Sequence, residues 1–168
     1  MLEQRLRAQN RVPDAALIGT AMIQGYQLRF HKQSRDESGK CNMFQTGVQE
    51  HVVYGVVFDV PEVQLKALDK AEGTGYHHEP VKVALRDGNH FCTLVYIADA
   101  NAIDDSLIPY DWYHSLVVTG ADQQKLPTAY ISALRAVRSK PDPSADRPEK
   151  LEAEAALRAY RAQQEGGK

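Results

Sequence analysis

The segment 81–97 constrains the fold more than any other part of this sequence. Residues 81–85 alternate apolar with polar side chains, and Phe91 to Ile97 form a second strand-like segment. Between them, Asp87-Gly88 is a dipeptide typical of tight hairpin turns. The sequence therefore predicts a β-hairpin over these residues.

Further strands and one short helix are predicted before the hairpin. Residues 16–30 are strand-like with a break near Gly25, and a polar loop follows from 32 to 40. The run 52–58 is so rich in β-branched and aromatic residues that it predicts a central strand buried on both faces. The helix is expected to begin at Pro61 and to end at Gly73, which suits a C-terminal cap. Its buried side is expected to carry Val63, Leu65 and Leu68.

Helices dominate the two ends of the chain. Leu2 and Leu6 have helical spacing, which puts three charged residues on the opposite, polar face: Glu3, Arg5 and Arg7. Two more helices are expected over 110–121 and 128–138, with Ile131 and Leu134 facing inward. Because strands and helices are interspersed without regular βαβ alternation, we expect an α+β fold with a small, mixed and curled sheet.

The composition changes after residue 140. Residues 141–148 contain three prolines and read as a linker. Residues 149–164 are Ala-rich and charged, and their sizeable apolar anchors are Leu151, Leu157 and Tyr160. We therefore expect a main domain over 1–139 and a tail over 140–168 that contains the linker and a loosely docked helix.

Length and charge narrow the classes of protein. A chain of 168 residues with 43% hydrophobic and 25% charged residues suits one globular domain with its own core. The net charge of −2 argues against general nucleic-acid binding. No segment has the ~20 apolar residues that cross a bilayer, and the N-terminus lacks a signal-peptide pattern, so we expect a cytoplasmic protein without a membrane partner. Cys41 and Cys92 are expected to be core residues.

Glu72 is the candidate catalytic residue. It ends the predicted helix of 61–73, where the chain turns into a strand. A carboxylate there is poorly solvated and faces the negative end of the helix dipole, and both effects raise its pKa. Glu72 is therefore suited to act as a general base, while the plain alternative is a solvated acid at a helix end.

A set of motifs occurs in a fixed order along residues 2–138. They are Arg11-Val12-Pro13-Asp14-Ala15, Gly25-Tyr26-Gln27-Leu28-Arg29-Phe30, Tyr54-Gly55-Val56-Val57-Phe58, Leu68-Asp69-Lys70-Ala71-Glu72-Gly73, Tyr113, and Leu126-Pro127-Thr128-Ala129-Tyr130. In that order and at those intervals, they resemble the γ-glutamylcyclotransferase superfamily, also known for its AIG2-like members.

The resemblance implies a barrel-like sheet flanked by helices and a reaction on γ-glutamyl compounds without metal or organic cofactor. The free α-amino group attacks its own γ-carbonyl, which closes 5-oxoproline and expels an amine or amino acid. Glu72 matches the family's catalytic glutamate, and Tyr113 matches a tyrosine at the substrate. Tyr76 matches another family tyrosine, although the loop before it is shorter here. Tyr96, in the returning hairpin strand, is expected to line the same pocket.

One family feature is not in the sequence. The family's substrate loop, Tyr-Gly-Ser-Asn, precedes the segment that aligns with Met1-Leu2-Glu3, and its backbone N–H groups hold the anionic end of the γ-glutamyl group. The sequence begins after that loop and the strand that leads into it. Since one such donor is worth ~10²–10³ in rate, we expect an N-terminally truncated fold and a nearly inactive chain. A misplaced start codon is the first explanation and a genuine truncation is the second.

Other functions stay open. A related γ-glutamyl lyase in a biosynthetic pathway would use the same Glu72, and a non-catalytic binding module would use the same scaffold. His77-His78-Glu79 is not expected to bind metal, because adjacent strand residues point to opposite faces. The sequence specifies neither the leaving amine nor the oligomeric state.

Overall fold

A four-stranded antiparallel sheet forms the centre of the fold. This computed structural model describes residues 2–166, and its strand order is β4-β1-β5-β6. The strands are β1 (Ala16–Gln24), β4 (Val52–Asp59), β5 (Tyr76–Leu85) and β6 (His90–Ala98). The predicted hairpin is confirmed as β5–β6, and its pairing extends back to Tyr76 and Ala98.

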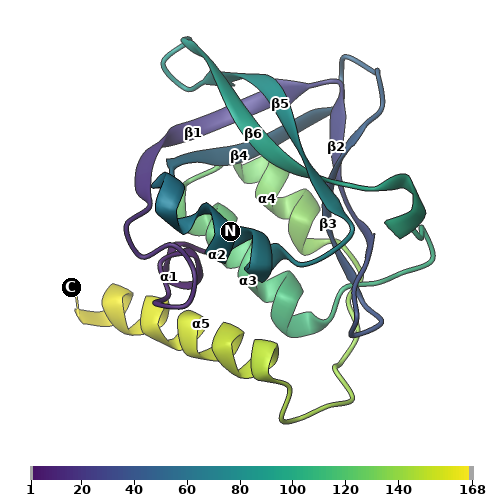
Figure 1. Cartoon of the computed structure of the whole chain (residues 1–168), viewed down its shortest axis with the longest axis vertical. Helices are drawn as coiled ribbons and strands as arrows, with labels where there is room; N and C mark the ends of the chain where they lie inside the picture. Colours follow the sequence, from purple (N-terminus) through teal and green to yellow (C-terminus); the bar gives the residue numbers. More distant parts are fainter. Residues whose placement is uncertain (1, 167–168) are drawn as a thin grey trace.

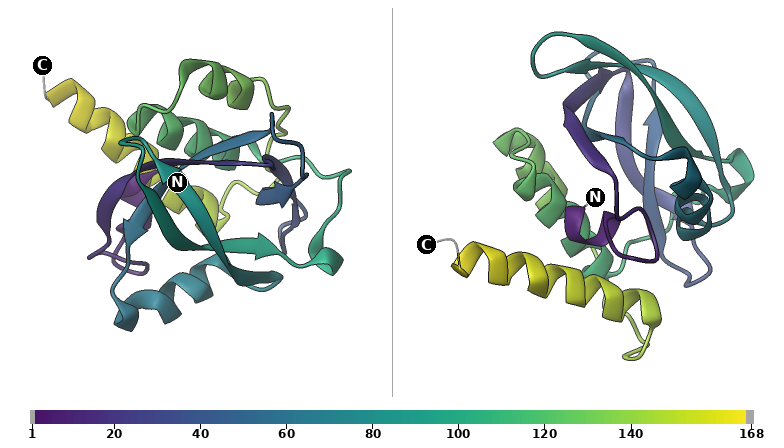
Figure 2. Two further views of the ribbon diagram at one scale, coloured as in Figure 1. Left: turned by 90° about the horizontal axis from the view of Figure 1, so that it is seen from above. Right: turned by 60° about the vertical axis from the view of Figure 1, so that its left-hand side comes forward.

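A second, two-stranded sheet gives the fold its barrel-like shape. β2 (Tyr26–Gln33) follows β1 through Gly25, whose φ of 82° favours glycine, and pairs with β3 (Gly39–Gln45). β2 lies beside β4 and β3 lies beside β6, so the two sheets approach each other at both edges (Figures 1 and 2). The α+β class and the curled sheet are confirmed, but every strand pairing in the described part of the chain is antiparallel rather than mixed.

The helices flank this barrel. They are α1 (Glu3–Leu6), α2 (Glu62–Glu72), α3 (Asp111–Gln123), α4 (Thr128–Arg135) and α5 (Pro148–Gly166), with a 3₁₀ turn at Ala100–Ala102. α3 and α4 pack together beside the barrel, and α5 runs across α1 and α3 on the outside (Figures 1 and 2). The helices predicted over 110–121 and 128–138 are confirmed as α3 and α4, and Ile131 and Leu134 are buried as predicted.

The barrel interior is apolar. Its buried cluster draws on β1, β3, β4 and β5 and contains Ala21, Met43, Val53, Val57, Val81 and Val83. On β4 and β5 these side chains alternate with residues that are less buried, as expected for strands with one buried face.

Helix α5 packs against the main domain. Leu157 and Ala153 are buried in a cluster with Leu2 and Trp112, and Tyr160 packs at its margin. Leu151, by contrast, is 48% exposed. Whether residues 140–168 behave as a separate segment stays a prediction, and residues 167 and 168 lie outside the described part.

The role predicted for residues 52–58 is wrong. β4 is the edge strand of its sheet, and its residues alternate between buried ones, such as Val53 and Val57, and half-buried ones. The error arises because a dense β-branched run has the same composition whether a strand is central or lies at an edge covered by a neighbouring sheet.

Three other expectations fail at the level of single residues or segments. Val63 is 89% exposed because it is five residues from the buried Leu68, which places it on the other side of α2. Cys92 is exposed on β6 rather than buried. Strand β3 was not predicted, since its sequence Gly39–Gln45 is largely polar.

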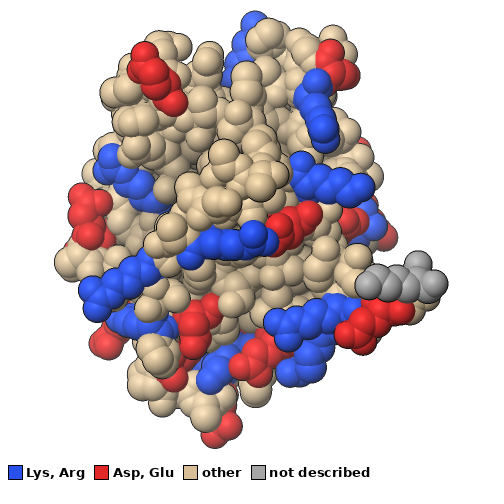
Figure 3. Space-filling view, turned by 180° about the vertical axis from the view of Figure 1, so that it is seen from behind, with Lys and Arg blue, Asp and Glu red and all other residues tan. Residues whose placement is uncertain are grey.

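The surface carries interspersed charge. On the face shown in Figure 3, acidic and basic side chains alternate over the lower half, and neither sign forms a continuous patch. Among residues 2–166, no helix combines the length and apolar composition that crossing a membrane would require.

Candidate active site

The end of α2 directs Glu72 into the molecule. Glu72 follows the buried Leu68 by four residues and therefore lies on the same face of the helix. The helix stops one residue later at Gly73, which has a φ of 80° and whose N–H donates to the carbonyl of Asp69 at 3.0 Å. The predicted cap is confirmed, and it makes Glu72 the last residue of the helix.

Glu72 lines a cavity of about 400 Å³. The cavity lies among the strands and helices α3 and α4, and its wall includes all four residues singled out from the sequence: Glu72, Tyr76, Tyr96 and Tyr113. A volume of this size falls in the usual range of small-molecule sites, about 300–1,000 Å³.

Tyr76 and Tyr113 hold the backbone of Cys41 from two sides. The Tyr76 hydroxyl donates to the Cys41 carbonyl at 2.7 Å, and the Cys41 N–H donates to the Tyr113 hydroxyl at 3.1 Å. The two tyrosines come from β5 and α3, and Cys41 belongs to β3. These bonds therefore tie three elements together at one end of the cavity.

Tyr96 is fixed to the helix that carries Glu72. Its hydroxyl donates to Oδ1 of Asp69 at 2.6 Å, and Nε2 of His78 lies 3.0 Å from the same oxygen. The Tyr96 ring also packs edge-on against Tyr76, with 6.3 Å between ring centroids. Tyr96 thus connects β6 to the last turn of α2.

Arg5 is the site residue that the sequence analysis missed. It was assigned to the polar face of the first helix, but it is only 9% exposed and lines the cavity. Among the described residues, the Arg5 side chain makes one hydrogen bond, a long one of 3.4 Å from Nη1 to the carbonyl of Glu149. Its guanidinium also lies over the Trp112 ring at 5.9 Å. Most of its donors are therefore available to a ligand.

Arg5 and Glu72 are the charged residues of the cavity wall, and they form no ion pair with each other. Burial raises the pKa of Glu72, and Arg11, Arg5 and Lys32 partly oppose this rise because their positive charges favour the carboxylate. Burial also lowers the pKa of Arg5, which nonetheless stays charged at neutral pH. The cavity wall therefore carries one half-buried carboxylate and one buried guanidinium as separate, opposite charges.

Cys41 is not a reactive nucleophile. Burial raises the pKa of its thiol to about 11, so the thiol is protonated at neutral pH and is a poor nucleophile. Its contribution to the site is the backbone that Tyr76 and Tyr113 hold.

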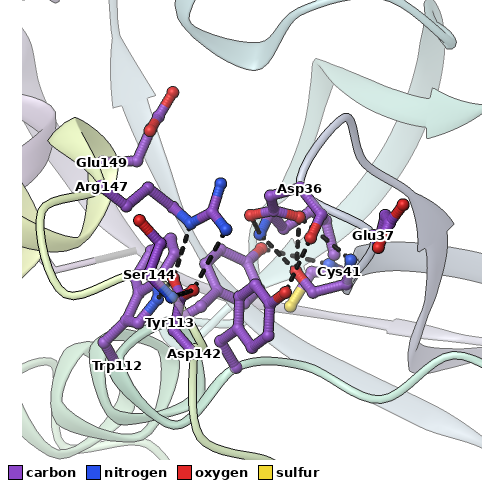
Figure 4. A network of polar contacts seen from close by, with 12 residues as sticks. Asp36, Glu37, Cys41, Trp112, Tyr113, Asp142, Ser144, Arg147 and Glu149 are labelled. Atoms are coloured by element: carbon purple, nitrogen blue, oxygen red, sulfur yellow. Dashed lines mark hydrogen bonds and ion pairs between the residues drawn. The ribbon is translucent and has the colours of Figure 1, made fainter.

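A polar network beside the cavity fixes the start of α3 (Figure 4). Asp142 accepts from Nε1 of Trp112 at 2.9 Å and from Nε of Arg147 at 2.6 Å. In the same network, Nζ of Lys40 donates to Asp36 at 2.6 Å and lies 4.8 Å from the centre of the Tyr113 ring. The network joins the β2–β3 hairpin, α3 and the linker before α5.

The two adjacent histidines have separate partners. His77 lies 2.8 Å from Asp99, whereas His78 lies 3.0 Å from Asp69. Within residues 2–166, no group of three or more metal-binding side chains comes together.

The comparisons with known proteins agree with this architecture. The sequence pattern of the AIG2-like family matches residues 52–134, the segment that carries Glu72, Tyr76, Tyr96 and Tyr113. A solved γ-glutamyl cyclotransferase matches 94% of this chain and 92% of its own, with a TM-score of 0.78 and 24% identity. Residues 52–134 thus match the AIG2-like family, and the chain has the fold of a γ-glutamyl cyclotransferase.

Two further solved structures have a similar fold. An uncharacterized human protein, loc79017, matches with a TM-score of 0.75 and 26% identity over 90% of each chain. YkqA from Bacillus subtilis matches 74% of this chain and 46% of its own, with a TM-score of 0.60 and 20% identity. No curated protein sequence matches. The AIG2-like match and the fold support a γ-glutamylcyclotransferase-type function in general terms.

Proposed function

We propose that the cavity binds γ-glutamyl compounds and releases 5-oxoproline by intramolecular attack of the substrate's α-amine. The observation that carries this proposal is a pair of separate opposite charges on the wall of one cavity, the half-buried Glu72 and the buried Arg5. An α-amino acid head carries one positive and one negative group on the same carbon, so it complements this pair.

Glu72 would act as the base. An α-ammonium group cannot attack until it loses a proton, and a carboxylate of raised pKa is well matched to take it. The freed nitrogen attacks the γ-carbonyl carbon, and a new C–N bond closes the five-membered ring. The ring nitrogen gives up a second proton, and the bond to the leaving nitrogen then breaks. The two protons lost by the α-nitrogen pass through Glu72 to the leaving nitrogen, which departs as an ammonium ion. Holding the reacting atoms together within one molecule makes this closure fast.

Arg5 would bind the α-carboxylate. A guanidinium donates two parallel hydrogen bonds to a carboxylate, and such charge-assisted bonds are strong in a buried site. The low exposure of Arg5 and its single long bond to Glu149 leave it suited to this role.

The two tyrosine hydroxyls would differ in function. The Tyr113 hydroxyl accepts a hydrogen bond from the Cys41 N–H, so its own O–H stays available as a donor. It can donate to the γ-carbonyl oxygen, which becomes negative during attack. Tyr76 already donates its proton to the Cys41 carbonyl, so it would position Cys41 and Tyr113 rather than bind that oxygen. Tyr96 would close the wall next to Glu72.

The assay for this function is 5-oxoproline release from a γ-glutamyl amino acid. The 168 residues contain no Tyr-Gly-Ser-Asn segment. We therefore propose that they turn over slowly by themselves, and that joining a family strand and Tyr-Gly-Ser-Asn loop ahead of Met1 accelerates release. Binding without any release by either form would instead indicate a non-catalytic binding module.

Substitution of Arg5 by Met is expected to raise KM for γ-glutamyl substrates about 10- to 100-fold, because hydrogen bonds to a charged group contribute about 1.5–3 kcal/mol. Met keeps much of the apolar stem, so packing on Trp112 is largely retained. The matched control is Arg7→Met, since the Arg7 side chain is 40% exposed and pairs with Glu3 at 3.0 Å. Equal kinetic effects of the two substitutions would remove Arg5 from the binding site.

A further inference from the structure

We propose that the apolar part of the cavity receives the leaving group, so that the preferred substrates are γ-glutamyl derivatives of apolar amines or amino acids. This inference rests on the proposed function, because it assumes that the γ-glutamyl head lies at Glu72 and Arg5. It adds what that function leaves open, namely the chemical class of the group that is expelled.

Polar and apolar residues are unevenly distributed over the cavity wall. The charge of Arg5 lies close enough to interact with Tyr113, and that of Glu72 with Tyr76 and Cys41. The barrel strands and α3 line the rest mainly with aliphatic side chains, among them Ala21, Leu28, Val53, Val57, Leu116 and Val117. A polar leaving group would have to give up its water to these side chains and could regain a hydrogen bond from the Tyr130 hydroxyl on α4, which has no partner among residues 2–166. An apolar leaving group gains from burial over the whole aliphatic wall.

The geometry of a γ-glutamyl compound determines which part of the cavity its leaving group would face. In a γ-glutamyl compound, the α-amine and α-carboxylate are at one end, and the leaving nitrogen is on the far side of the γ-carbonyl. With the head bound between Glu72 and Arg5, the leaving group therefore extends away from the charged residues. The aliphatic wall is the part of the cavity that it would meet.

The apolar wall of the cavity leaves space unfilled next to Gly55. Ala21 on β1 and Gly55 on β4 are direct partners in the sheet, and both line the cavity. Strand alternation puts Gly55 on the same face as the buried Val53 and Val57. A Cβ added at Gly55 would nevertheless meet no atom within 4 Å. Two small residues opposite each other thus leave room for a ligand where larger side chains could have filled the core.

The test measures binding and turnover of a homologous series of γ-glutamyl n-alkylamides, from methyl to butyl. If the leaving group enters the aliphatic chamber, each added methylene should improve Kd, and kcat/KM where turnover occurs, about fourfold, or about 60-fold over the series. A hydroxyl at the end of the alkyl chain should cancel most of this gain. Equal affinity along the series, or tighter binding of the hydroxylated members, would overturn the inference.

A filling substitution gives a second, independent test. Gly55→Leu should remove most of the gain of the butylamide over the methylamide and leave methylamide binding within about twofold, because the new side chain occupies the space of the alkyl chain. Gly19→Leu is the matched control, since Gly19 is a strand glycine with open space around its Cβ that does not line the cavity. Ala21→Val enters the same space from β1 and repeats the test if Gly55→Leu does not fold. Loss of the gain in the control as well would contradict the inference.

A third set of compounds distinguishes failure of the proposed function from failure of the leaving-group assignment. N-alkylbutyramides carry the same alkyl chains without the α-amine and α-carboxylate. If they bind as tightly as the γ-glutamyl compounds, the proposed function is wrong. If the γ-glutamyl head is recognised but chain length has no effect, the function stands and the assignment of the apolar chamber is wrong.

Discussion

Replacing Glu72 with Gln is expected to lower the rate of 5-oxoproline release by ~10²–10⁴, the usual contribution of a general base. Gln has nearly the same shape and can accept a hydrogen bond, but it cannot take the proton from the α-ammonium group. Substrate binding should change much less than kcat, because Arg5 still holds the carboxylate. The measurement is kcat and KM for one γ-glutamyl substrate, made on the chain joined to the Tyr-Gly-Ser-Asn loop.

The same substitution should stabilise the fold at neutral pH. The pKa of Glu72 is raised in the folded state by burial, so the folded state binds its proton more tightly than the unfolded state does. Stability of the wild-type chain is then lost as pH rises from the ordinary glutamate range through the raised pKa. Glu72→Gln should therefore unfold at higher urea than wild type at pH 8, and this difference should vanish in acid below the ordinary glutamate range.

Glu62→Gln is the matched control for both effects. Glu62 is in the first turn of the same helix and is exposed. Its loss should leave turnover unchanged and should not stabilise the protein, since an acid there interacts favourably with the helix dipole. If Glu62→Gln reduced turnover as much as Glu72→Gln, or if Glu72→Gln kept normal turnover, Glu72 would not be the base.

Leu157→Ala is expected to reduce the free energy of unfolding by about 2–5 kcal/mol, the typical cost of removing a buried leucine side chain. Leu157 is 7% exposed and packs with Leu2, Trp112 and Leu116 beneath the cavity. The measurement is urea unfolding followed by circular dichroism and by Trp112 fluorescence.

Leu151→Ala makes the same chemical change in the same helix. Because Leu151 is 48% exposed, it should cost no more than about 0.5 kcal/mol. Equal, small effects of the two substitutions would mean that α5 is a loosely attached tail in solution, as the linker of residues 141–148 first suggested. A large difference would mean that α5 is part of the main domain.

The sequence was most informative where local rules agree with the fold. Asp87-Gly88 between two strand-like segments predicted the hairpin, and Gly73 predicted the end of α2. These features depend on turn chemistry and helical periodicity, which act over a few residues.

The remaining features depend on contacts between distant parts of the chain. Helical spacing put Arg5 on a polar face, and only the packing of α5 and Trp112 around it turns that face into a cavity wall. β3 has too few apolar residues to read as a strand, yet it pairs with β2 and carries Cys41, which both tyrosines bind. Likewise, composition could not reveal that β4 is an edge strand, because the curl of the barrel covers that edge.

The most direct test of the central claim is the fate of the γ-carbonyl during turnover in H₂¹⁸O. Intramolecular amine attack forms 5-oxoproline without any oxygen from water, so mass spectrometry should find unlabelled 5-oxoproline and the free amine in equal amounts. Attack by water would instead give glutamate that carries ¹⁸O. Unlabelled 5-oxoproline that disappears in Glu72→Gln is the predicted result, and labelled glutamate as the first product would contradict it.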